Sequence, residues 1–408
     1  MGLGAMVQEM PLHVALLFNG NKIYDREVIA GVGSYLATAR VLWNLFLEDD
    51  YRCRLQGIGE WWGDGVIADF DDPDVHAALL KKHLPVVAVG GSYLNETDYP
   101  DWSPYVCTDN QGLVRLAYEH LVEVGLRRLA FFSMPPSPYN RWAQEREKAF
   151  GLLAERDNLP IEIYRGSSTS AESWNDSIEK LICWLQAQRK PIGIVAVNDT
   201  RARHVIQACL LAGIPVPEEV ALVGIDNDPL SRHLTRVPIT SVIQGTHEMG
   251  RVAASLLQQM LQGARLPRTR IVVPPVGIEF RASSEHERLA DRYVMRARYF
   301  IRQHAALGVK TDQVADYVGL SRSSLESRFR KELDCTVHEE VLRFRLDLAK
   351  SLLCAGGMST ADIAFKSGFT SAQYLHAVFR RELGCTPREY RLQARTAVVA
   401  APDAGRSE

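Results

Sequence analysis

The sequence lacks the cysteine patterns of disulfide-bonded and zinc-binding proteins. It holds seven cysteines, an odd number, and no two of them stand at Cys-x-x-Cys spacing. They are scattered along the chain at Cys53, Cys107, Cys183, Cys209, Cys335, Cys354 and Cys385. A disulfide framework or a zinc site needs paired or closely spaced cysteines. We therefore expect reduced thiols, no metal site and a cytoplasmic protein.

Long hydrophobic runs are also missing. The apolar runs have the length of strands, far short of the roughly 20 residues that span a bilayer. The first residues do not show the basic, apolar and small-residue segments of a secretory signal in that order. We expect no association with a membrane.

Motifs of the common enzyme classes are absent as well. There is no Walker A loop and no Gly-x-Ser-x-Gly, and His247-Glu248 lacks the second histidine of a zinc protease. Gly31-Val32-Gly33 lies inside a helical pattern rather than after a strand, so we interpret it as helix–sheet packing. We predict no catalytic residue, no cofactor and no enzymatic activity.

Charge is unevenly distributed along the 408 residues. The net charge is −2, from 47 Lys and Arg against 49 Asp and Glu. Residues 286–395 alone carry 19 basic against 13 acidic residues, so the remainder is acidic. A basic C-terminal part on an acidic body is typical of a protein that binds phosphates through one domain. Solvated helices can show the same excess, so the charge matters only because a motif coincides with it.

That motif is a duplicated helix-turn-helix pattern. The two copies span residues 311–329 and 359–379. Each reads as a short helix with an internal alanine, a glycine turn and a polar N-cap that opens a second helix. Similar tails follow at residues 330–336 and 380–386. The duplication predicts two recognition helices that bind double-stranded operator DNA in successive major grooves.

The second helix of each copy carries the predicted base-reading residues, because its N-terminal part enters the major groove. Arginine can read guanine and glutamine can read adenine, whereas Lys331 and Arg381 further along are expected at phosphates. The polar, solvent-side candidates are Arg322, Ser323, Glu326, Arg328, Ser371, Gln373, His376 and Arg380. The alternative is a helical bundle with solvated charges.

Strand-like and helix-like segments alternate through the first part of the chain. Continuous apolar runs such as 192–197 and 220–225 alternate with helical patterns such as 143–154 and 200–212. This alternation predicts parallel sheets with helices on both faces, and the length favours two lobes. The fold class is thus a two-lobed doubly wound α/β sensor followed by an all-α domain. The expected boundaries are a leader at 1–11, the sensor at 12–281, a polar linker at 282–287, the helical domain at 288–396 and a tail at 397–408.

Polar residues recur directly after the predicted buried strands. They are Asp69, Asp71, Asp109, Asn110, Asn198, Asp199, Asp226 and Asn227. Ligands of open α/β sheets bind beyond the carboxyl ends of the strands, where carboxylates and amides can bond to the hydroxyls of a sugar. Aromatic rings can cover the apolar face of a sugar, and Trp61, Trp62, Trp102 and Trp142 are candidates. Aspartate is also frequent at turns and helix caps, so each residue alone has a structural alternative.

The helical domain resembles the AraC-type transcription activators, which carry two helix-turn-helix units joined by a long helix. The match runs through Ile363-Ala364, Gly368-Phe369, Phe379-Arg380 and Thr386-Pro387-Arg388-Glu389-Tyr390-Arg391, and residues 336–354 stand where the long helix is expected. Leu375-His376-Ala377 departs from the family pattern, which affects base preference rather than the fold.

The first part of the chain resembles the periplasmic-binding-protein-like sensor of LacI-type repressors. Thr108-Asp109-Asn110, Arg146, Asn198-Asp199 and Val223-Gly224-Ile225-Asp226-Asn227 are among the pieces that carry the likeness. That sensor joined to an AraC-type domain resembles the xylose-responsive activators, with Tyr24-Asp25-Arg26 among the matching residues. The resemblance adds Asp25, Arg26 and Arg146 to the expected ligand site.

The resemblance implies a D-xylose-responsive DNA-binding activator of xylose catabolism genes. A homodimer and contact with RNA polymerase are expected with it. The residues alone leave the effector open, because the same site suits another pentose, a hexose or a small polar metabolite. Two further alternatives are a sugar-modifying enzyme that binds DNA and a nucleoid-type structural protein.

Overall fold

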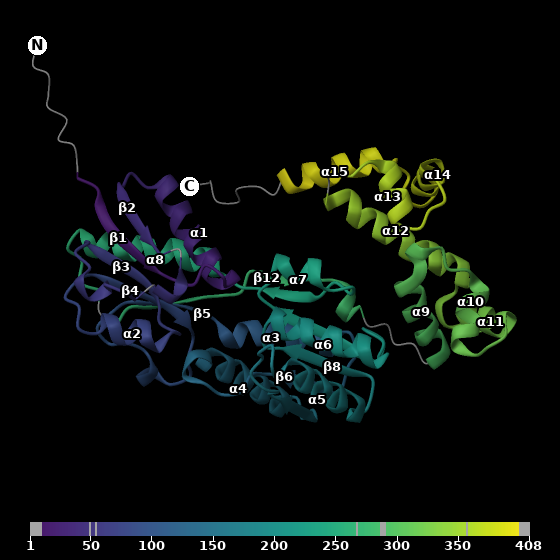
Figure 1. Ribbon diagram of the computed structural model, residues 1–408, viewed down its shortest axis with the longest axis horizontal. Coiled ribbons are helices and arrows are strands. Elements are labelled where there is room, and N and C mark those ends of the chain that lie inside the picture. The colour runs from purple at the N-terminus through teal and green to yellow at the C-terminus, as the bar shows by residue number, and fades with distance from the viewer. Residues whose placement is uncertain are drawn as a thin grey trace, which may run out of the picture. The chain divides into compact units, whose positions relative to one another are not determined.

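The structure is a computed structural model that describes residues 10–48, 50–53, 55–266, 268–285, 291–355 and 358–399. The chain divides into two compact units, Met1–His286 and Glu287–Glu408 (Figure 1). The first unit contains two parallel sheets and the second is helical, which confirms the predicted fold class. Among the helices in the described ranges, none is long and apolar enough to cross a membrane.

The first lobe of the sensor unit is a six-stranded sheet in the order β11-β5-β4-β3-β1-β2, with every neighbouring pair parallel. Its strands are β1 (Leu12–Leu17), β2 (Trp43–Leu47), β3 (Gly65–Asp69), β4 (Val86–Gly91), β5 (Tyr105–Thr108) and β11 (Arg270–Val273). Its helices are α1 (Ile23–Thr38), α2 (Pro73–Leu79) and α8 (Thr246–Leu261). The inner strands are apolar on both faces because helices or loops cover both, as Val66, Ile67 and Ala68 show with no exposed surface.

The second lobe repeats this plan in the order β12-β10-β9-β8-β6-β7, with only β12 antiparallel to its neighbour. Its strands are β6 (Leu129–Phe132), β7 (Ile161–Tyr164), β8 (Ile192–Ala196), β9 (Val220–Ile225), β10 (Thr240–Ile243) and β12 (Gly277–Glu279). Its helices are α3 (Asn110–Glu123), α4 (Arg141–Arg156), α5 (Trp174–Ala187), α6 (Asp199–Ala212) and α7 (Pro229–Leu234). The chain crosses between the lobes three times, after β5, after β10 and after β11.

Gly31 packs a helix against a helix, so the expected helix–sheet contact was wrong. An added Cβ at Gly31 would lie 1.9 Å from the carbonyl oxygen of His247, and one at Gly250 would lie 1.9 Å from that of Val28. The backbones of α1 and α8 therefore touch, and only glycine fits at the two crossing positions.

The second unit holds two helix-turn-helix subdomains that share one long helix. The first comprises α9 (Arg292–His304), a 3₁₀ turn η6 (Ala305–Leu307), α10 (Thr311–Val318) and α11 (Arg322–Leu333). The second comprises α13 (Thr360–Lys366), α14 (Ala372–Leu383) and α15 (Pro387–Val399). Helix α12 (Val337–Ala355) contributes its first half to one apolar core and its second half to the other.

The helix starts in both subdomains follow from matched capping residues. The hydroxyl oxygens of Ser321 and Ser371 accept hydrogen bonds from backbone N–H groups in the first turns of α11 and α14, at 3.3 and 3.1 Å. The turns before them use Gly319 and Gly368, with φ of 75° and 81°, a conformation that glycine adopts without steric cost.

The start of the predicted linker belongs to the sensor instead. Residues 282–284 form a 3₁₀ turn in which Ser283 has no exposed surface. The Ser283 hydroxyl donates to the carbonyl oxygen of Leu222 at 2.6 Å and accepts from the Thr240 N–H at 2.8 Å. A small polar segment can therefore be buried when its hydroxyls complete a sheet edge. Residues 286–290 lie outside the described residues, as do residues 1–9 of the expected leader (1–11) and residues 400–408 of the expected tail (397–408). Helix α15 runs to Val399, past the expected start of that tail.

Candidate functional site

Arg146 lies where the carboxyl ends of the two sheets meet. It comes from α4 and is 3% exposed. Its Nε donates to the Asn110 side-chain oxygen at 2.9 Å and its Nη1 donates to the Val197 carbonyl at 2.7 Å. The guanidinium lies over the Trp142 ring, 4.7 Å from the ring centre. Burial lowers the pKa of Arg146 while nearby carboxylates, Asp226 first, raise it, so a fixed positive charge stands among acids.

Asp226 directly follows β9 and has a strained backbone conformation. Its φ is 118° and that of Asn227 is 53°, values that non-glycine residues rarely adopt outside functional sites and turns. The Asp226 carboxylate accepts from Gln244 Nε2 at 2.6 Å, and Gln244 in turn accepts from the Thr108 hydroxyl of the first lobe at 3.0 Å. Burial raises the pKa of Asp226 to about 6, and the charge of Arg146 opposes that rise. Gln244 is thus a site residue that the sequence-based prediction did not include, whereas Asn110 was named there and accepts from Arg146.

Three carboxylates of the first lobe gather at the ends of β1 and β3. Lys22 Nζ donates to the Asp69 carboxylate at 3.4 Å. The Asp71 carboxylate accepts from the Gly91 N–H at 2.9 Å and from the Tyr93 hydroxyl. Asp25 has no exposed surface and accepts from the Asn19 N–H at 2.5 Å through Oδ2. Burial raises the pKa of Asp25 to about 6.

The second oxygen of Asp25 distinguishes it from its neighbours. Within the described residues, Asp25 Oδ1 is buried and has no hydrogen-bond partner. A buried acceptor without a partner costs free energy, typically 1–3 kcal/mol, unless a ligand or a water supplies a donor. A sugar hydroxyl would supply that donor.

Two of the predicted ligand residues are helix caps. Asp109 accepts from the Gly112 N–H at 2.8 Å at the start of α3, and Asn198 accepts from the Arg201 N–H at 2.9 Å at the start of α6. Their positions after buried strands are explained by the helices that they open, without a ligand.

Three more of the predicted residues bond within the lobe that carries them. Both oxygens of the buried Asp199 are used, one by the Ser241 hydroxyl at 2.7 Å and one by the Asp228 N–H at 2.8 Å. Burial, together with the charge of Asp226, raises the pKa of Asp199 to about 8. Asn227 accepts from Arg281 Nη2 at 2.5 Å, and the exposed Arg26 donates to the Gly20 carbonyl at 2.9 Å.

Of the four candidate tryptophans, only Trp142 lies beside Arg146. Trp61 and Trp62 stack on each other 5.8 Å apart, just before β3 begins, and Trp62 contacts His13 at the start of β1. Trp102 stacks on His76, just before β5. Trp61 and Trp62 precede β3 and lie beside the start of β1, at the amino ends of the sheet, so expecting these two at a site on the carboxyl ends was wrong. Trp102 also packs on Phe70, which directly follows the carboxyl end of β3.

Contacts from the start of α4 join the second lobe to the first. Arg141 Nη2 lies 2.8 Å from Asp98 Oδ1, and its guanidinium lies over the Tyr93 ring. The Glu145 carboxylate accepts from the Leu94 N–H at 3.0 Å. The helix that supplies Arg146 thus also connects the two lobes.

The two reading helices present equivalent exposed faces. Ser323 of α11 and Gln373 of α14 occupy the same position after the N-cap serine, and both are exposed. Ser327 and Ala377, one turn further on, are exposed as well, and residues four apart share a helix face. Neither of these last two was among the predicted base readers. The exposed Arg322 pairs with Asp312 at 3.4 Å and corresponds to Ala372, so its role has no counterpart in the second copy.

Two predicted base readers instead hold the first subdomain together. The Glu326 carboxylate accepts from the Val337 N–H at 3.2 Å, at the start of α12. Arg328 pairs with Asp291 and lies 4.9 Å from the centre of the Tyr293 ring. Polar residues flanking the core can thus look like surface residues in the sequence. In α14, Arg380 is exposed and His376 is half-buried.

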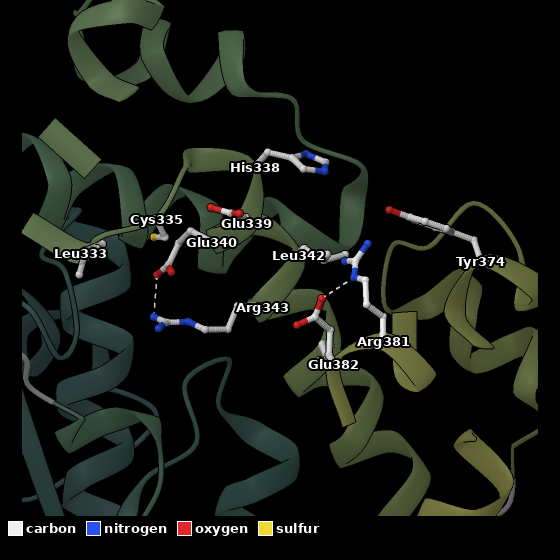
Figure 2. A pocket seen from close by; sticks show the side chains of 11 residues that line it. Leu333, Cys335, His338, Glu339, Glu340, Leu342, Arg343, Tyr374, Arg381 and Glu382 are labelled. Carbon is white, nitrogen blue, oxygen red and sulfur yellow. Dashed lines mark hydrogen bonds and ion pairs between the residues drawn. The ribbon is translucent and has the colours of Figure 1, made fainter. Parts of the chain in front are cut away.

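A groove of about 560 Å³ lies between the end of α11, the first half of α12 and α14. Figure 2 shows two ion pairs among its charged side chains, Glu340 with Arg343 and Glu382 with Arg381. Glu340 is buried and bonds Arg298 at 2.6 Å and Arg343 at 2.8 Å, and Arg381 bonds Glu382 at 2.7 Å. The charges are compensated, so the groove favours no small ion. Among the described residues, no group of three His, Cys, Asp or Glu side chains could hold a metal ion.

Comparisons with known proteins agree with this two-part plan. Three family models match: the XylR N-terminal domain at residues 13–111, a periplasmic binding protein-like domain at 118–284 and a helix-turn-helix domain at 314–393. The xylose operon regulatory protein of Escherichia coli (strain K12) is 44% identical over 378 residues, which is 93% of this chain and 96% of that protein. That of Haemophilus influenzae is 41% identical over 93% of this chain and 98% of its own length.

Solved structures give the same result. The structure of a xylose-binding transcription activator, xylR, superposes with a TM-score of 0.88 and 42% identity, over 94% of this chain and 99% of that one. A complex of the transcriptional regulator CelR with cellobiose matches the sensor part, with a TM-score of 0.54, 25% identity and 67% of this chain against 84% of that one.

Proposed function

This chain belongs to the family of the xylose operon regulatory proteins, and we propose on that basis that it activates xylose catabolism genes in response to D-xylose. The observation that carries the proposal is the fixed charge of Arg146 among buried carboxylates at the junction of two lobes, in a chain that also carries two helix-turn-helix units. We propose that it works in the cytoplasm and catalyses no reaction.

The proposed sugar site uses groups from both lobes. On one side of the pyranose, Asp226 accepts hydrogen bonds from sugar hydroxyls and Arg146 donates hydrogen bonds to them. On the other side, Asp25 and Asp69 accept hydrogen bonds from sugar hydroxyls. Trp142 covers an apolar C–H face of the ring. Because Asp25 Oδ1 is buried without a partner among the described residues, a sugar hydroxyl there supplies the donor that this oxygen needs.

The proposed switch is a change in how the lobes close. A sugar that bonds to both lobes favours the closed state by its differential affinity for the two states, and no other property of a ligand can shift the equilibrium. In a homodimer, closure would change how the two protomers present their reading helices to the operator. RNA polymerase is the partner that an activator at a promoter requires.

The reading faces proposed for DNA are the exposed sides of α11 and α14. Ser323, Gln373 and the exposed residues one turn beyond meet base edges, and Arg330 and Lys331 further along α11 meet phosphates. Arg380, expected from the sequence to read bases, stands in α14 where Arg330 stands in α11, so we assign it to phosphate as well.

Thermal unfolding with a panel of sugars tests the proposal. D-xylose should raise the melting temperature of the full chain more than L-arabinose, D-ribose or D-glucose, because a ligand of the folded state at 100 times its Kd adds about 2.7 kcal/mol. An Asp226→Asn variant should lose most of that rise. A larger rise with another sugar would identify that sugar as the effector.

A further inference from the structure

Gly368 stands where the second helix-turn-helix subdomain touches the first. An added Cβ at Gly368 would lie 2.5 Å from the Ala305 carbonyl oxygen and 2.9 Å from Ala306 Cα. Both atoms belong to the backbone of η6, in the first subdomain, and backbone cannot move aside as a flexible side chain can. The turn of one subdomain is therefore seated directly on the backbone of the other.

The equivalent glycine of the first subdomain has no such neighbour. Gly319 has φ of 75° against 81° at Gly368, so both turns use the same left-handed conformation. Within 4 Å of an added Cβ at Gly319, the described residues place no atom. The conformation explains both glycines, but only the contact with η6 explains why a Cβ at Gly368 has no room.

Arg345 of the shared helix α12 fixes the same turn from another side. Its Nε donates to the Ala305 carbonyl at 2.8 Å and its Nη2 donates to the Val309 carbonyl at 3.3 Å. The carbonyl that Gly368 approaches is thus already held on α12, which also supplies part of the second core. Gly368, the η6 backbone and Arg345 form one joint, which we name the η6 joint.

We infer that the η6 joint locks the two subdomains into one rigid reader, so that Gly368 and Arg345 are positioning residues that set the spacing of the two half-sites on DNA. The inference rests on the proposed use of both reading helices. Two helices in successive major grooves need a separation of about one helical turn, roughly 34 Å. A rigid pair matches one spacing only, whereas a pair on a flexible connection follows a spacing that changes.

A measurement without DNA tests rigidity directly. Spin labels on non-canonical residues at positions 323 and 373 report the distance between α11 and α14 by double electron–electron resonance, with labelled chain diluted in unlabelled chain. The wild type and Gly319→Ala should give equally narrow distributions, and Gly368→Ala a clearly broader or displaced one. Equal distributions in all three would overturn the joint whether or not the chain binds DNA.

Binding to spaced duplexes tests the consequence. The probe is a duplex that the full-length wild-type chain enriches from a random library, with one base pair inserted between its two half-sites. The DNA affinity of the wild type and of Gly319→Ala should fall roughly tenfold or more on insertion, because the second reading helix no longer reaches its half-site. Gly368→Ala should bind the original duplex more weakly and lose less than about threefold on insertion.

Arg345→Gln keeps the test decisive if Gly368→Ala does not fold. It removes both clamping hydrogen bonds and leaves the glycine in place, and it should also broaden the distance distribution and reduce the insertion penalty. If Arg345→Gln loses as much affinity on insertion as the wild type and keeps a narrow distance distribution, the inference is contradicted. If the wild type enriches no duplex, the DNA-binding proposal fails and the distance measurement alone decides the joint.

Discussion

Arg141 and Asp98 join the two lobes of the sensor, with the Arg141 Nη2 atom 2.8 Å from the Asp98 Oδ1 atom. Arg141 starts α4 in the second lobe, and Asp98 lies in the first lobe between β4 and β5. Neither is among the groups that we propose to touch sugar, so the pair can act on sugar binding only through the closure of the lobes.

Arg141→Gln should therefore weaken D-xylose binding by about 1.4- to fivefold, the effect of losing a partly exposed ion pair worth about 0.2–1 kcal/mol. Isothermal titration calorimetry measures it. Arg156→Gln is the matched control, because Arg156 pairs with Asp157 at 2.7 Å on the same helix with similar exposure and within one lobe. Equal affinities of the two variants would show that the Arg141 pair does not favour closure.

Arg146→Lys should weaken sugar binding by roughly tenfold or more while the fold survives. Lysine keeps the positive charge but cannot make two directed hydrogen bonds and stack on Trp142 at the same time. Calorimetry with D-xylose gives the affinity, and urea unfolding checks the fold. Wild-type affinity in a folded Arg146→Lys variant would assign Arg146 a structural role only.

Asp199 should make the free sensor less stable as pH rises. The folded-state pKa of Asp199 is raised to about 8, so between its ordinary pKa and pH 8 the folded chain holds a proton that the unfolded chain has released. The stability from this proton is present at low pH and is lost as pH rises through 8, at up to about 1.4 kcal/mol per pH unit. Asp25 and Asp226 have folded-state pKa values of about 6, so the stability that their protons contribute is lost at lower pH.

Asp199→Asn tests whether Asp199 makes the stability fall as pH rises, because the amide stays neutral and can still bond Ser241 and the Asp228 N–H. Urea unfolding between pH 6.5 and 8.5 should give a flatter dependence for Asp199→Asn than for the wild type. Asp157→Asn, at an exposed carboxylate bonded to Arg156, should keep the wild-type slope. Equal slopes for the wild type and Asp199→Asn would mean that Asp199 is ionised across this range.

Strand ends were the most predictable part of the sensor, because apolar runs such as 220–225 are continuous and turn polar at one residue. The sequence could not separate Asp226 from Asp199, since both follow a buried strand. What separates them is the Ser241 hydroxyl, which comes from a different strand and binds Asp199. For Trp61 and Trp62 a signal was available. They stand before a strand, at the amino end of the sheet.

The reading helices were predictable to within one turn for a similar reason. The serine caps and glycine turns are local signals, and they placed the starts of both helices correctly. The role of Arg328 was not predictable, because its partner Asp291 lies 37 residues away. Burial of Gly368 against η6 is a contact between subdomains, which no local pattern encodes.

Gln373→Ala and Ser323→Ala should each relax the preference at particular base pairs, by about 1–3 kcal/mol for a bidentate contact such as that of glutamine with adenine. Lys331→Ala should weaken all sequences alike and lower the salt slope by about one. Binding across an operator library at several salt concentrations separates the two effects. Unchanged base preference in Gln373→Ala would mean that the reading face is misassigned.

Arg328→Ala should behave differently from both groups. Its partner is Asp291 rather than DNA, so removing this ion pair should lower the melting temperature of the helical unit. The base preference and the salt slope should stay as in the wild type. A change in base preference for this variant would restore Arg328 to the reading face.

The central claim is that one sugar and one DNA site are linked through the sensor, and linkage is reciprocal. The most direct measurement is the affinity of the full-length chain for an enriched duplex, by fluorescence anisotropy, with and without saturating D-xylose, in the wild type and in Asp226→Asn. We predict that D-xylose changes the DNA affinity of the wild type about 5- to 150-fold, that the duplex changes the D-xylose affinity by the same factor, and that Asp226→Asn shows neither effect. A DNA affinity that D-xylose leaves unchanged in the wild type would contradict the account.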